Sequence, residues 1–416
     1  MTIENAAPAN AASPWRRVSD ACIIGGSLLV AASLCAGGVF LVVPFALQTD
    51  TLAANTAVLS IASILLIYGA LLVWVGRALR DNRLRAPFRL PAPSIFLGAL
   101  FLTLAIGQTI LFANILPALW FPIWHVLASL LFPLAVLSFS ARRLDAVSIR
   151  SVLAQFTWGG LVTVGLALIL ELIVGVFLML LAALGIAAIL GPSALDNLVQ
   201  TFTRAPTDIE QLVEIILQRP LAIFIAGGAA LLWVILLVPL MEELLKAIGV
   251  AFLLRRRARQ ALWPTRGNAV LWGLAAGAGF AFSENLLNGQ GALNNPNAQT
   301  GAWASAMILR AGTSLMHMVM TATVAVGWHE ALVARHPIRL PLLLLAAMLA
   351  HAIWNTVAVL QGSVSVARTA DTPLASASTV LSVLTLALLA LLFIGYIYWL
   401  RALLQWARHD ADSIST

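Results

Sequence analysis

Three charged residues lie within five positions of the apolar stretch VPLMEELLKAIGVAFLL (238–254). They are Glu242, Glu243 and Lys246, and Lys246 is the only lysine in the chain. Glu242 and Lys246 are four positions apart, so on a helix they can pair on one face. Glu243 is rotated by about 100° from Glu242 and can point elsewhere. A carboxylate held in this way can take a proton from water, which is the chemistry of a hydrolytic base.

Further polar residues that could join such a site lie in the apolar runs that follow. They are Glu284, His317, His351 and Asn355. At a rise of about 1.5 Å per residue, Glu243, His317 and His351 each lie roughly 17 Å from the end of their run that is expected to face the cytoplasm. Glu284 comes out deeper, at about 25 Å. The sequence therefore predicts that groups from three different helices meet at one depth.

Each charged side chain near the centre of a bilayer costs roughly 2.5–3.5 kcal/mol, so the three in 242–246 must face the interior of a bundle or a water-filled cavity. Neutral histidine and asparagine can bind a metal ion or stabilise an oxyanion. Neither HExxH nor GxSxG occurs in the chain, so neither common soluble hydrolase motif applies. We expect Glu171 and His125 to be structural. We expect Arg310 to pair with an acid or reach toward the membrane surface.

The composition indicates an all-α, polytopic integral membrane protein. The 416 residues are 61% hydrophobic and 10% charged, with a mean hydropathy of +0.96, whereas soluble domains are about 25% charged. The net charge of +7 does not indicate nucleic-acid binding, because the arginines cluster between apolar runs. Cys22 and Cys35 share one predicted helix and are too far apart for a disulfide.

About ten membrane-spanning helices are expected from the apolar runs. The runs are 20–47, 52–76, 94–114, 117–139, 155–190, 221–254, 268–288, 303–328, 340–360 and 377–400. The fifth and sixth exceed one span and should tilt, protrude or break. With ten spans, all arginine clusters fall on one side, so both termini should be cytoplasmic.

Four regions are predicted along the chain. Residues 1–190 form a membrane region of unknown role, and 191–220 an extracytoplasmic amphipathic segment that begins a short helix at TDIE (207–210). Residues 221–360 carry the polar residues, and 361–416 form a last span and a short tail. Within the third region, Gly273, Gly277 and Ala281 form a small-residue stripe that lets another helix approach closely.

The polar residues resemble the motifs of the PrsW family of intramembrane proteases, which is related to the CAAX prenyl protease and bacteriocin-processing group. EELLK (242–246) is similar to the family's EExxK motif, and GFAFSEN (279–285) to its FxxxE motif. HAIWN (351–355) resembles its late histidine motif, and His317 lies where the family often has another histidine. The resemblance covers roughly 221–360.

The resemblance implies roles for the residues that carry it. Glu242 and Glu243 would activate water, and Lys246 would give electrostatic support. Glu284, His317 and His351 would complete the site, with Asn355 as an oxyanion donor. Glu243, His317 and His351 would suit a catalytic zinc ion, which takes three protein ligands and an open position. A glutamate–histidine mechanism without metal is equally consistent.

The expected function is an intramembrane endopeptidase that cuts membrane-anchored protein substrates in regulated proteolysis. The expected place is a bacterial inner membrane, with the lipid bilayer and the substrate as partners and no nucleic acid. A proton- or ion-coupled transporter is the alternative, because carboxylates and histidines near the membrane midplane also serve as proton relays. A membrane scaffold that retains an inactive site is a third reading.

Overall fold

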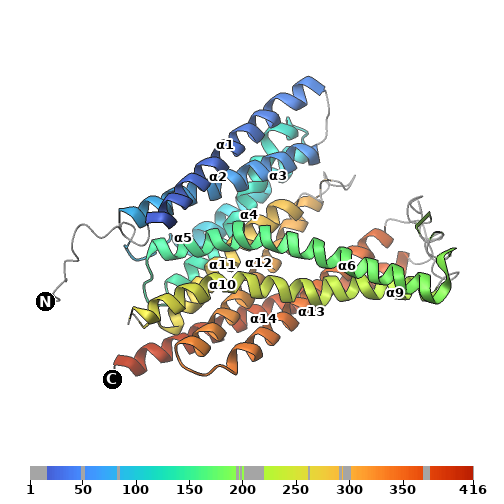
Figure 1. Cartoon of the computed structure of the whole chain (residues 1–416). Helices are drawn as coiled ribbons and strands as arrows, with labels where there is room; N and C mark the ends of the chain where they lie inside the picture. Colours follow the sequence, from blue (N-terminus) through green and yellow to red (C-terminus); the bar gives the residue numbers. More distant parts are fainter. Residues whose placement is uncertain are drawn as a thin grey trace. The chain divides into compact units, whose positions relative to one another are not determined.

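The computed structural model describes most of the chain. The described residues are 16–47, 52–81, 85–193, 196, 199–200, 220–260, 263–289, 293, 301–368 and 375–415. Within them the chain is helical and forms no strand (Figure 1). The amphipathic helix predicted from 207 onward lies outside the described residues.

The helical bundle predicted from the composition is confirmed. Nine helical segments of the described chain are long and apolar enough to cross a membrane. The 31-residue α12, which is more polar, brings the number to the ten expected. The side of the membrane on which the termini lie stays a prediction. The helices are α1 (Arg16–Leu47), α2 (Leu52–Arg80), α3 (Pro93–Phe112), α4 (Pro117–Ala141), α5 (Ile149–Thr157), α6 (Val164–Leu190), α9 (Pro220–Leu231), α10 (Val238–Arg259), α11 (Arg266–Asn288), α12 (Ala302–Leu332), α13 (Arg339–Arg368) and α14 (Ala375–Ser415).

The two overlong apolar runs each contain one turn of π-helix rather than a break. The first run belongs to a continuous helical segment of 42 residues, Ile149–Leu190, in which η1 (Trp158–Thr163) joins α5 to α6. The second belongs to a segment of 40 residues, Pro220–Arg259, in which η2 (Leu232–Leu237) joins α9 to α10. A π-helical turn is wider than an α-helical one and is frequent at functional sites. The η2 turn directly precedes the helix that carries Glu242 and Glu243.

The described chain divides into two compact units. The first unit comprises residues 1–161 and 278–311, and the second comprises 162–277 and 312–416. This division differs from the four consecutive regions read from the sequence, because α11 and α12 each contribute residues to both units.

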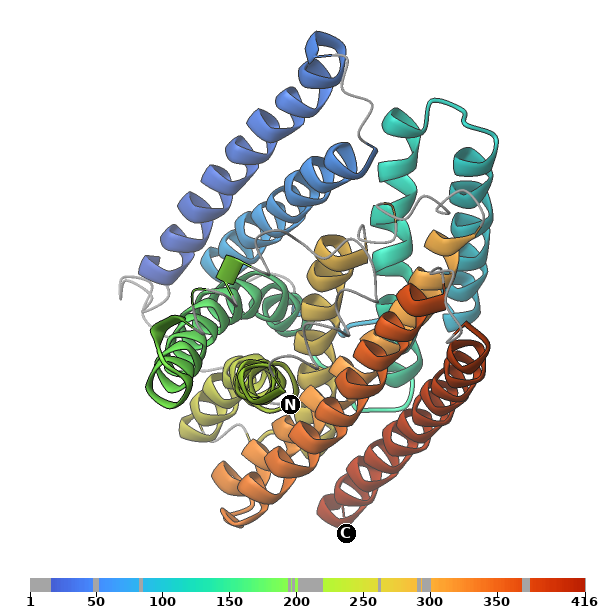
Figure 2. The same ribbon diagram turned by 90° about the vertical axis from the view of Figure 1, so that its right-hand side faces the viewer.

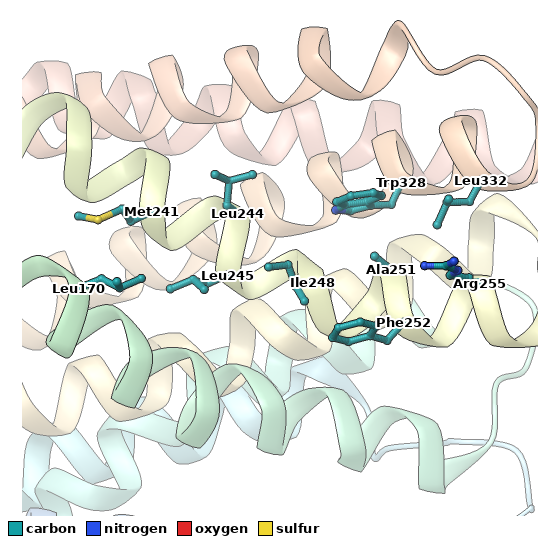
Figure 3. Close-up of a pocket in the computed structure, with 10 residues that line it drawn as sticks. All are labelled: Leu170, Met241, Leu244, Leu245, Ile248, Ala251, Phe252, Arg255, Trp328 and Leu332. Atoms are coloured by element: carbon teal, nitrogen blue, oxygen red, sulfur yellow. The ribbon is translucent and has the colours of Figure 1, made fainter.

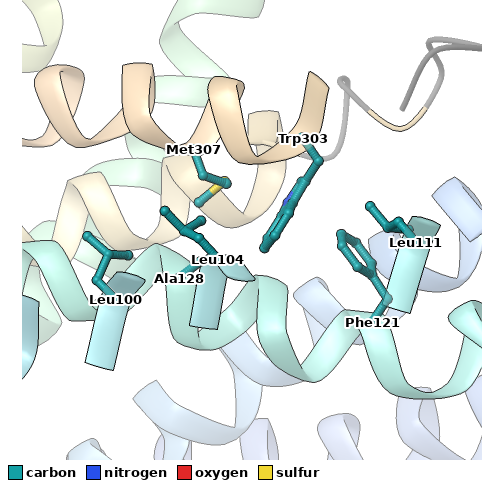
Figure 4. Close-up of a cluster of buried hydrophobic side chains, with 7 residues drawn as sticks. All are labelled: Leu100, Leu104, Leu111, Phe121, Ala128, Trp303 and Met307. Atoms are coloured by element: carbon teal, nitrogen blue, oxygen red, sulfur yellow. The ribbon is translucent and has the colours of Figure 1, made fainter. Parts of the chain in front are cut away.

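In the first unit, α1 lies along α2, and α3 along α4 (Figure 2). Buried apolar side chains of α3, α4 and the start of α12 pack together around Phe121 and Trp303 (Figure 4). The two rings meet edge to face, with centroids 4.8 Å apart. The buried Tyr68 hydroxyl donates to the Gly279 carbonyl oxygen at 2.8 Å. The Tyr68 hydrogen bond ties α2 to α11, and the Phe121–Trp303 contact ties α4 to α12.

In the second unit, α6 lies beside α9 and α10, α10 contacts α13, and α13 contacts α14 (Figure 1). Small residues bring α11 and α12 to backbone contact there. A Cβ atom on Gly273 would lie 2.6 Å from the Ala322 Cα, and one on Gly277 would lie 2.6 Å from the Met318 Cα. The close approach predicted from the glycine stripe is therefore confirmed at these two positions.

An ion cluster joins three helix ends of the second unit. Glu330, fully buried near the end of α12, accepts hydrogen bonds from Arg266 Nε of α11 and Arg339 Nη1 of α13, both at 2.5 Å. Burial raises the pKa of the Glu330 carboxyl, but the two arginines outweigh it and hold that pKa below its ordinary value of 4.5. The cluster fixes the ends of the three helices that follow α10.

Replacing Gly277 by alanine should lower the stability of the second unit. The added methyl group would meet the Met318 backbone and the His317 carbonyl oxygen, which lie 2.6 and 2.8 Å from the new Cβ. Overpacking of this kind costs about 1–3 kcal/mol. Thermal unfolding in detergent micelles measures the loss. Gly228→Ala is the matched control, because nothing lies within 4 Å of a Cβ there. Equal midpoints for the two variants would contradict the close packing.

The Glu330 cluster should make the protein sensitive to acid. Since the folded pKa is depressed, its contribution is complete above pH 4.5 and is lost as the pH falls through the lower folded value. Glu330→Gln should cost about 1.5–3 kcal/mol near pH 7 and should flatten the loss of stability below pH 4.5. Thermal unfolding midpoints measured across about pH 3–7 test this prediction. Asp145→Asn, at an exposed position, is the control and should keep the wild-type dependence of the thermal midpoint on pH. If the midpoint of Glu330→Gln falls with pH in parallel to that of the wild type, the cluster does not cause the acid sensitivity.

Candidate functional site

Helix α10 buries three charged side chains in the second unit. Relative exposure is 7% for Glu242 and 0% for Glu243 and Lys246. The helix begins at Val238, directly after η2, with Pro239 in its first turn. Proline has no N–H to donate to the preceding π-helical turn. Leu244 and Leu245 separate Glu243 from Lys246, and Met241, Leu244 and Ile248 make the opposite face of α10 apolar. One helix thus presents two carboxylates and an ammonium to the interior.

The Lys246 ammonium lies at the centre of these contacts. Its Nζ donates to Glu243 Oε1 at 2.7 Å and to Glu242 Oε2 at 3.1 Å. It also lies 2.9 Å from His317 Nδ1. Removing one partner of a buried ion pair costs about 3–5 kcal/mol, because the other charge is left uncompensated. Glu242 and Glu243 are 100° apart around the helix, yet both reach the same ammonium.

Two histidines from α12 and α13 complete the cluster. His351 Nδ1 lies 2.9 Å from Glu243 Oε1, and His317 Nδ1 lies 3.8 Å from Glu242 Oε2. The two imidazole rings meet edge to face, with centroids 4.9 Å apart and planes at 85°. Both histidines are 1% exposed. The structure thus brings together Glu243, His317 and His351, which the sequence places at one depth on three helices.

The cluster has the donor set of a metal site. One potential ligand atom from each of Glu242, Glu243, His317 and His351 lies within 4.8 Å of the others. Carboxylate oxygen and imidazole nitrogen are common zinc ligands, bound at about 2.0–2.2 Å. A tetrahedral ion at that distance places its ligands about 3.3–3.6 Å apart, so the side chains would have to draw closer around it. The residues fit a metal ion in kind, and small side-chain movements would bring them to its spacing.

Two residues that the sequence reasoning did not assign to the site lie at the cluster or next to it. Thr321 Oγ1 donates to Glu243 Oε2 at 3.4 Å, one turn from His317 on α12. The Tyr396 hydroxyl of α14 donates to the Ala350 carbonyl oxygen at 2.8 Å, next to His351. Thr321 lies four residues after His317, and this helical spacing was a signal that it shares the face of His317. Tyr396 is one of two tyrosines, with Tyr398, in a long apolar run. No sequence pattern singled it out, because only the packing of α13 against α14 brings it near.

Glu284 belongs to the first unit, whereas the residues just described belong to the second. Its Oε1 is 3.0 Å from Arg310 Nη2 and accepts a hydrogen bond from Asn288 Nδ2 at 3.2 Å. Arg310 Nε also donates to Asn285 Oδ1 at 2.9 Å. Of the two expectations for Arg310, pairing with an acid is the one found. The catalytic role of Glu284 stays a prediction from its motif.

Asn355 lies one turn beyond His351 on α13 and is partly buried. No contact recorded for the described residues links its amide to the cluster, so its role as an oxyanion donor also stays a prediction. His125 is fully buried in the first unit and accepts a hydrogen bond from Trp303 Nε1 at 3.2 Å. That contact fits the structural role expected for His125.

A cavity of about 490 Å³ lies along α10, away from the cluster (Figure 3). Its walls are Leu170 of α6, the Met241 to Arg255 face of α10, and Trp328 and Leu332 of α12. At 100° per residue, Met241, Leu244 and Ile248 lie opposite Glu243 and Lys246. The lining is apolar apart from Arg255 and the Trp328 nitrogen, and it includes none of the cluster residues. This cavity offers no groups for catalysis.

Comparison with known proteins identifies one family. A family model described as PrsW family intramembrane metalloprotease matches residues 147–392. The match exceeds half of the 416 residues and extends beyond the 221–360 covered by the sequence motifs, into the fifth and last predicted spans. No curated protein and no solved structure matches the chain.

Proposed function

Because the chain belongs to the PrsW family of intramembrane metalloproteases, we propose that it cleaves membrane-anchored proteins at the Glu242–Glu243–His317–His351 cluster. The observation that carries the proposal is the convergence of two carboxylates and two imidazoles from three helices, all buried. Intramembrane ionisable residues are functional by default, because each carries a large desolvation cost.

The two glutamates have different surroundings, which supports different roles. The Glu243 side chain is 0% exposed, and its carboxylate contacts Lys246, His351 and Thr321. The Glu242 side chain is 10% exposed. We assign water activation to Glu242, whose carboxylate accepts the proton as the hydroxyl group attacks the peptide carbonyl. The same proton can then pass to the leaving nitrogen, as general acid–base catalysis requires.

Glu243, His317 and His351 are the proposed metal ligands, and zinc is the proposed metal. Three protein ligands and an open position are the usual arrangement of catalytic zinc. A bound zinc ion supplies a Lewis acid that polarises the peptide carbonyl and lowers the pKa of water. Glu242 Oε2 lies 3.8 Å from His317 Nδ1 and 3.9 Å from His351 Nε2. It is therefore close enough to act on a water molecule held by these ligands.

The remaining residues of the proposed site support the reaction. Lys246 compensates the charge of the two carboxylates, and its hydrogen bonds fix their rotamers. Asn355 is the proposed oxyanion donor, and a catalytic role for Glu284 is proposed from its sequence motif alone. The proposed setting is a bacterial plasma membrane with both termini cytoplasmic, supported by the arginine clusters, and the proposed process is regulated proteolysis.

Substitutions should separate the two glutamates. Glu242→Gln should lower the cleavage rate of a membrane-anchored substrate in liposomes at least 100-fold, as loss of a general base does, while bound metal is retained. Glu243→Gln and His351→Ala should lose both cleavage and metal, because each removes a ligand. Glu171→Gln, an acid of another membrane helix outside the cluster, is the matched control and should cleave normally.

Cleavage at the wild-type rate by both Glu243→Gln and His351→Ala would contradict the assignment of the site. Substrate-dependent pH changes in proteoliposomes, with no cleavage by the wild-type protein, would instead support a proton-coupled transporter.

A further inference from the structure

Lys246 lies among the atoms that would ligate a metal ion. Its Nζ contacts Glu243 Oε1 at 2.7 Å, His317 Nδ1 at 2.9 Å and Glu242 Oε2 at 3.1 Å. Its side chain is 0% exposed, so bulk solvent does not stabilise the positive charge. An ammonium donates three hydrogen bonds and accepts none. Three groups of the metal-capable cluster receive these contacts.

The spacing of the cluster lies between the spacings expected around an ammonium and around a zinc ion. Contacts of 2.7–3.1 Å around one tetrahedral centre place the partners about 4.4–5.1 Å apart, whereas zinc bonds give about 3.3–3.6 Å. The potential ligand atoms lie within 4.8 Å of one another, and Glu242 Oε2 lies 3.8 Å from His317 Nδ1. The side chains thus hold the Lys246 ammonium and would need only to draw closer to hold a smaller cation.

We propose that the Lys246 ammonium and a divalent metal ion compete for one position between Glu243 and His317. The inference rests on the proposed function for the identity of the ligands. Metal binding requires the ammonium to withdraw, because both cations need the same Glu243 oxygen and His317 nitrogen. Lys246 then acts as a resident competitor that keeps metal binding reversible, and metal supply controls the state of the site.

The chain allows this exchange to be followed at one atom. Lys246 is the only lysine, so full-length protein labelled with ¹³C at lysine Cε gives one lysine signal in detergent micelles. Titration with zinc should shift that signal, with the change complete at one equivalent. Zinc that binds at one equivalent and leaves the signal in place overturns the proposal. This measurement uses the wild-type protein and does not depend on whether a variant folds.

Variants of Lys246 test the same competition by affinity. Lys246→Met and Lys246→Gln remove the competing charge and should bind zinc at least tenfold more tightly than the wild type in equilibrium dialysis, a change of about 1.4 kcal/mol. Lys246→Arg is the matched control, because arginine keeps the charge, and its zinc affinity should stay within a few-fold of the wild type. Neutral variants that bind zinc no more tightly than Lys246→Arg contradict the proposal.

The outcomes distinguish this inference from the proposed function. Zinc binding that displaces Lys246 in a protein that cleaves nothing supports the competition and refutes the protease assignment. Cleavage by a wild-type protein that binds no zinc refutes the competition and leaves the protease activity in place.

Discussion

The structure depends on keeping charge inside an apolar bundle. Glu243 and Lys246 are both fully buried, and each would be costly alone in hydrocarbon. Their contact at 2.7 Å, extended by Glu242, His317 and His351, is the arrangement that makes this burial tolerable. Breaking it from either side would leave a charge without a partner. The same network that stabilises the helix is therefore the source of its chemistry.

The need to pair the buried charges also fixes the positions of the helices around α10. His317 and His351 can meet the carboxylates only if α12 and α13 keep fixed positions beside α10. Backbone contact at Gly273 and Gly277 sets the approach of α11 to α12. At the other end, Glu330 ties α11, α12 and α13 through two arginines. Small residues and an ion cluster outside the site thus position the helices that carry it.

Much of this arrangement could be predicted from the sequence. Composition and run lengths predict the helical bundle, because few other structures can span a bilayer. A rise of 1.5 Å per residue is enough to place Glu243, His317 and His351 at one depth. The Gly273 and Gly277 contacts follow from four-residue spacing of small side chains.

Other features required the tertiary structure. Tyr396 comes near His351 only through the packing of α14, which no local pattern encodes. The π-helical turns in the two long runs have no sequence signature that we could identify. Glu284 has the motif of a site residue, yet it pairs with Arg310 in the other unit, because helical depth says nothing about which partner a side chain faces. Rotation around a helix axis and long-range packing are the quantities that one sequence leaves open.

Metal analysis of the purified protein, combined with cleavage of a membrane-anchored substrate with and without chelator, tests the central claim most directly. The account predicts one zinc ion per chain in zinc-supplemented protein, loss of cleavage in chelator and recovery when zinc is returned. Cleavage at the full rate by protein shown to be free of metal would contradict it, because the carboxylates and histidines would then act without the ion they are proposed to bind.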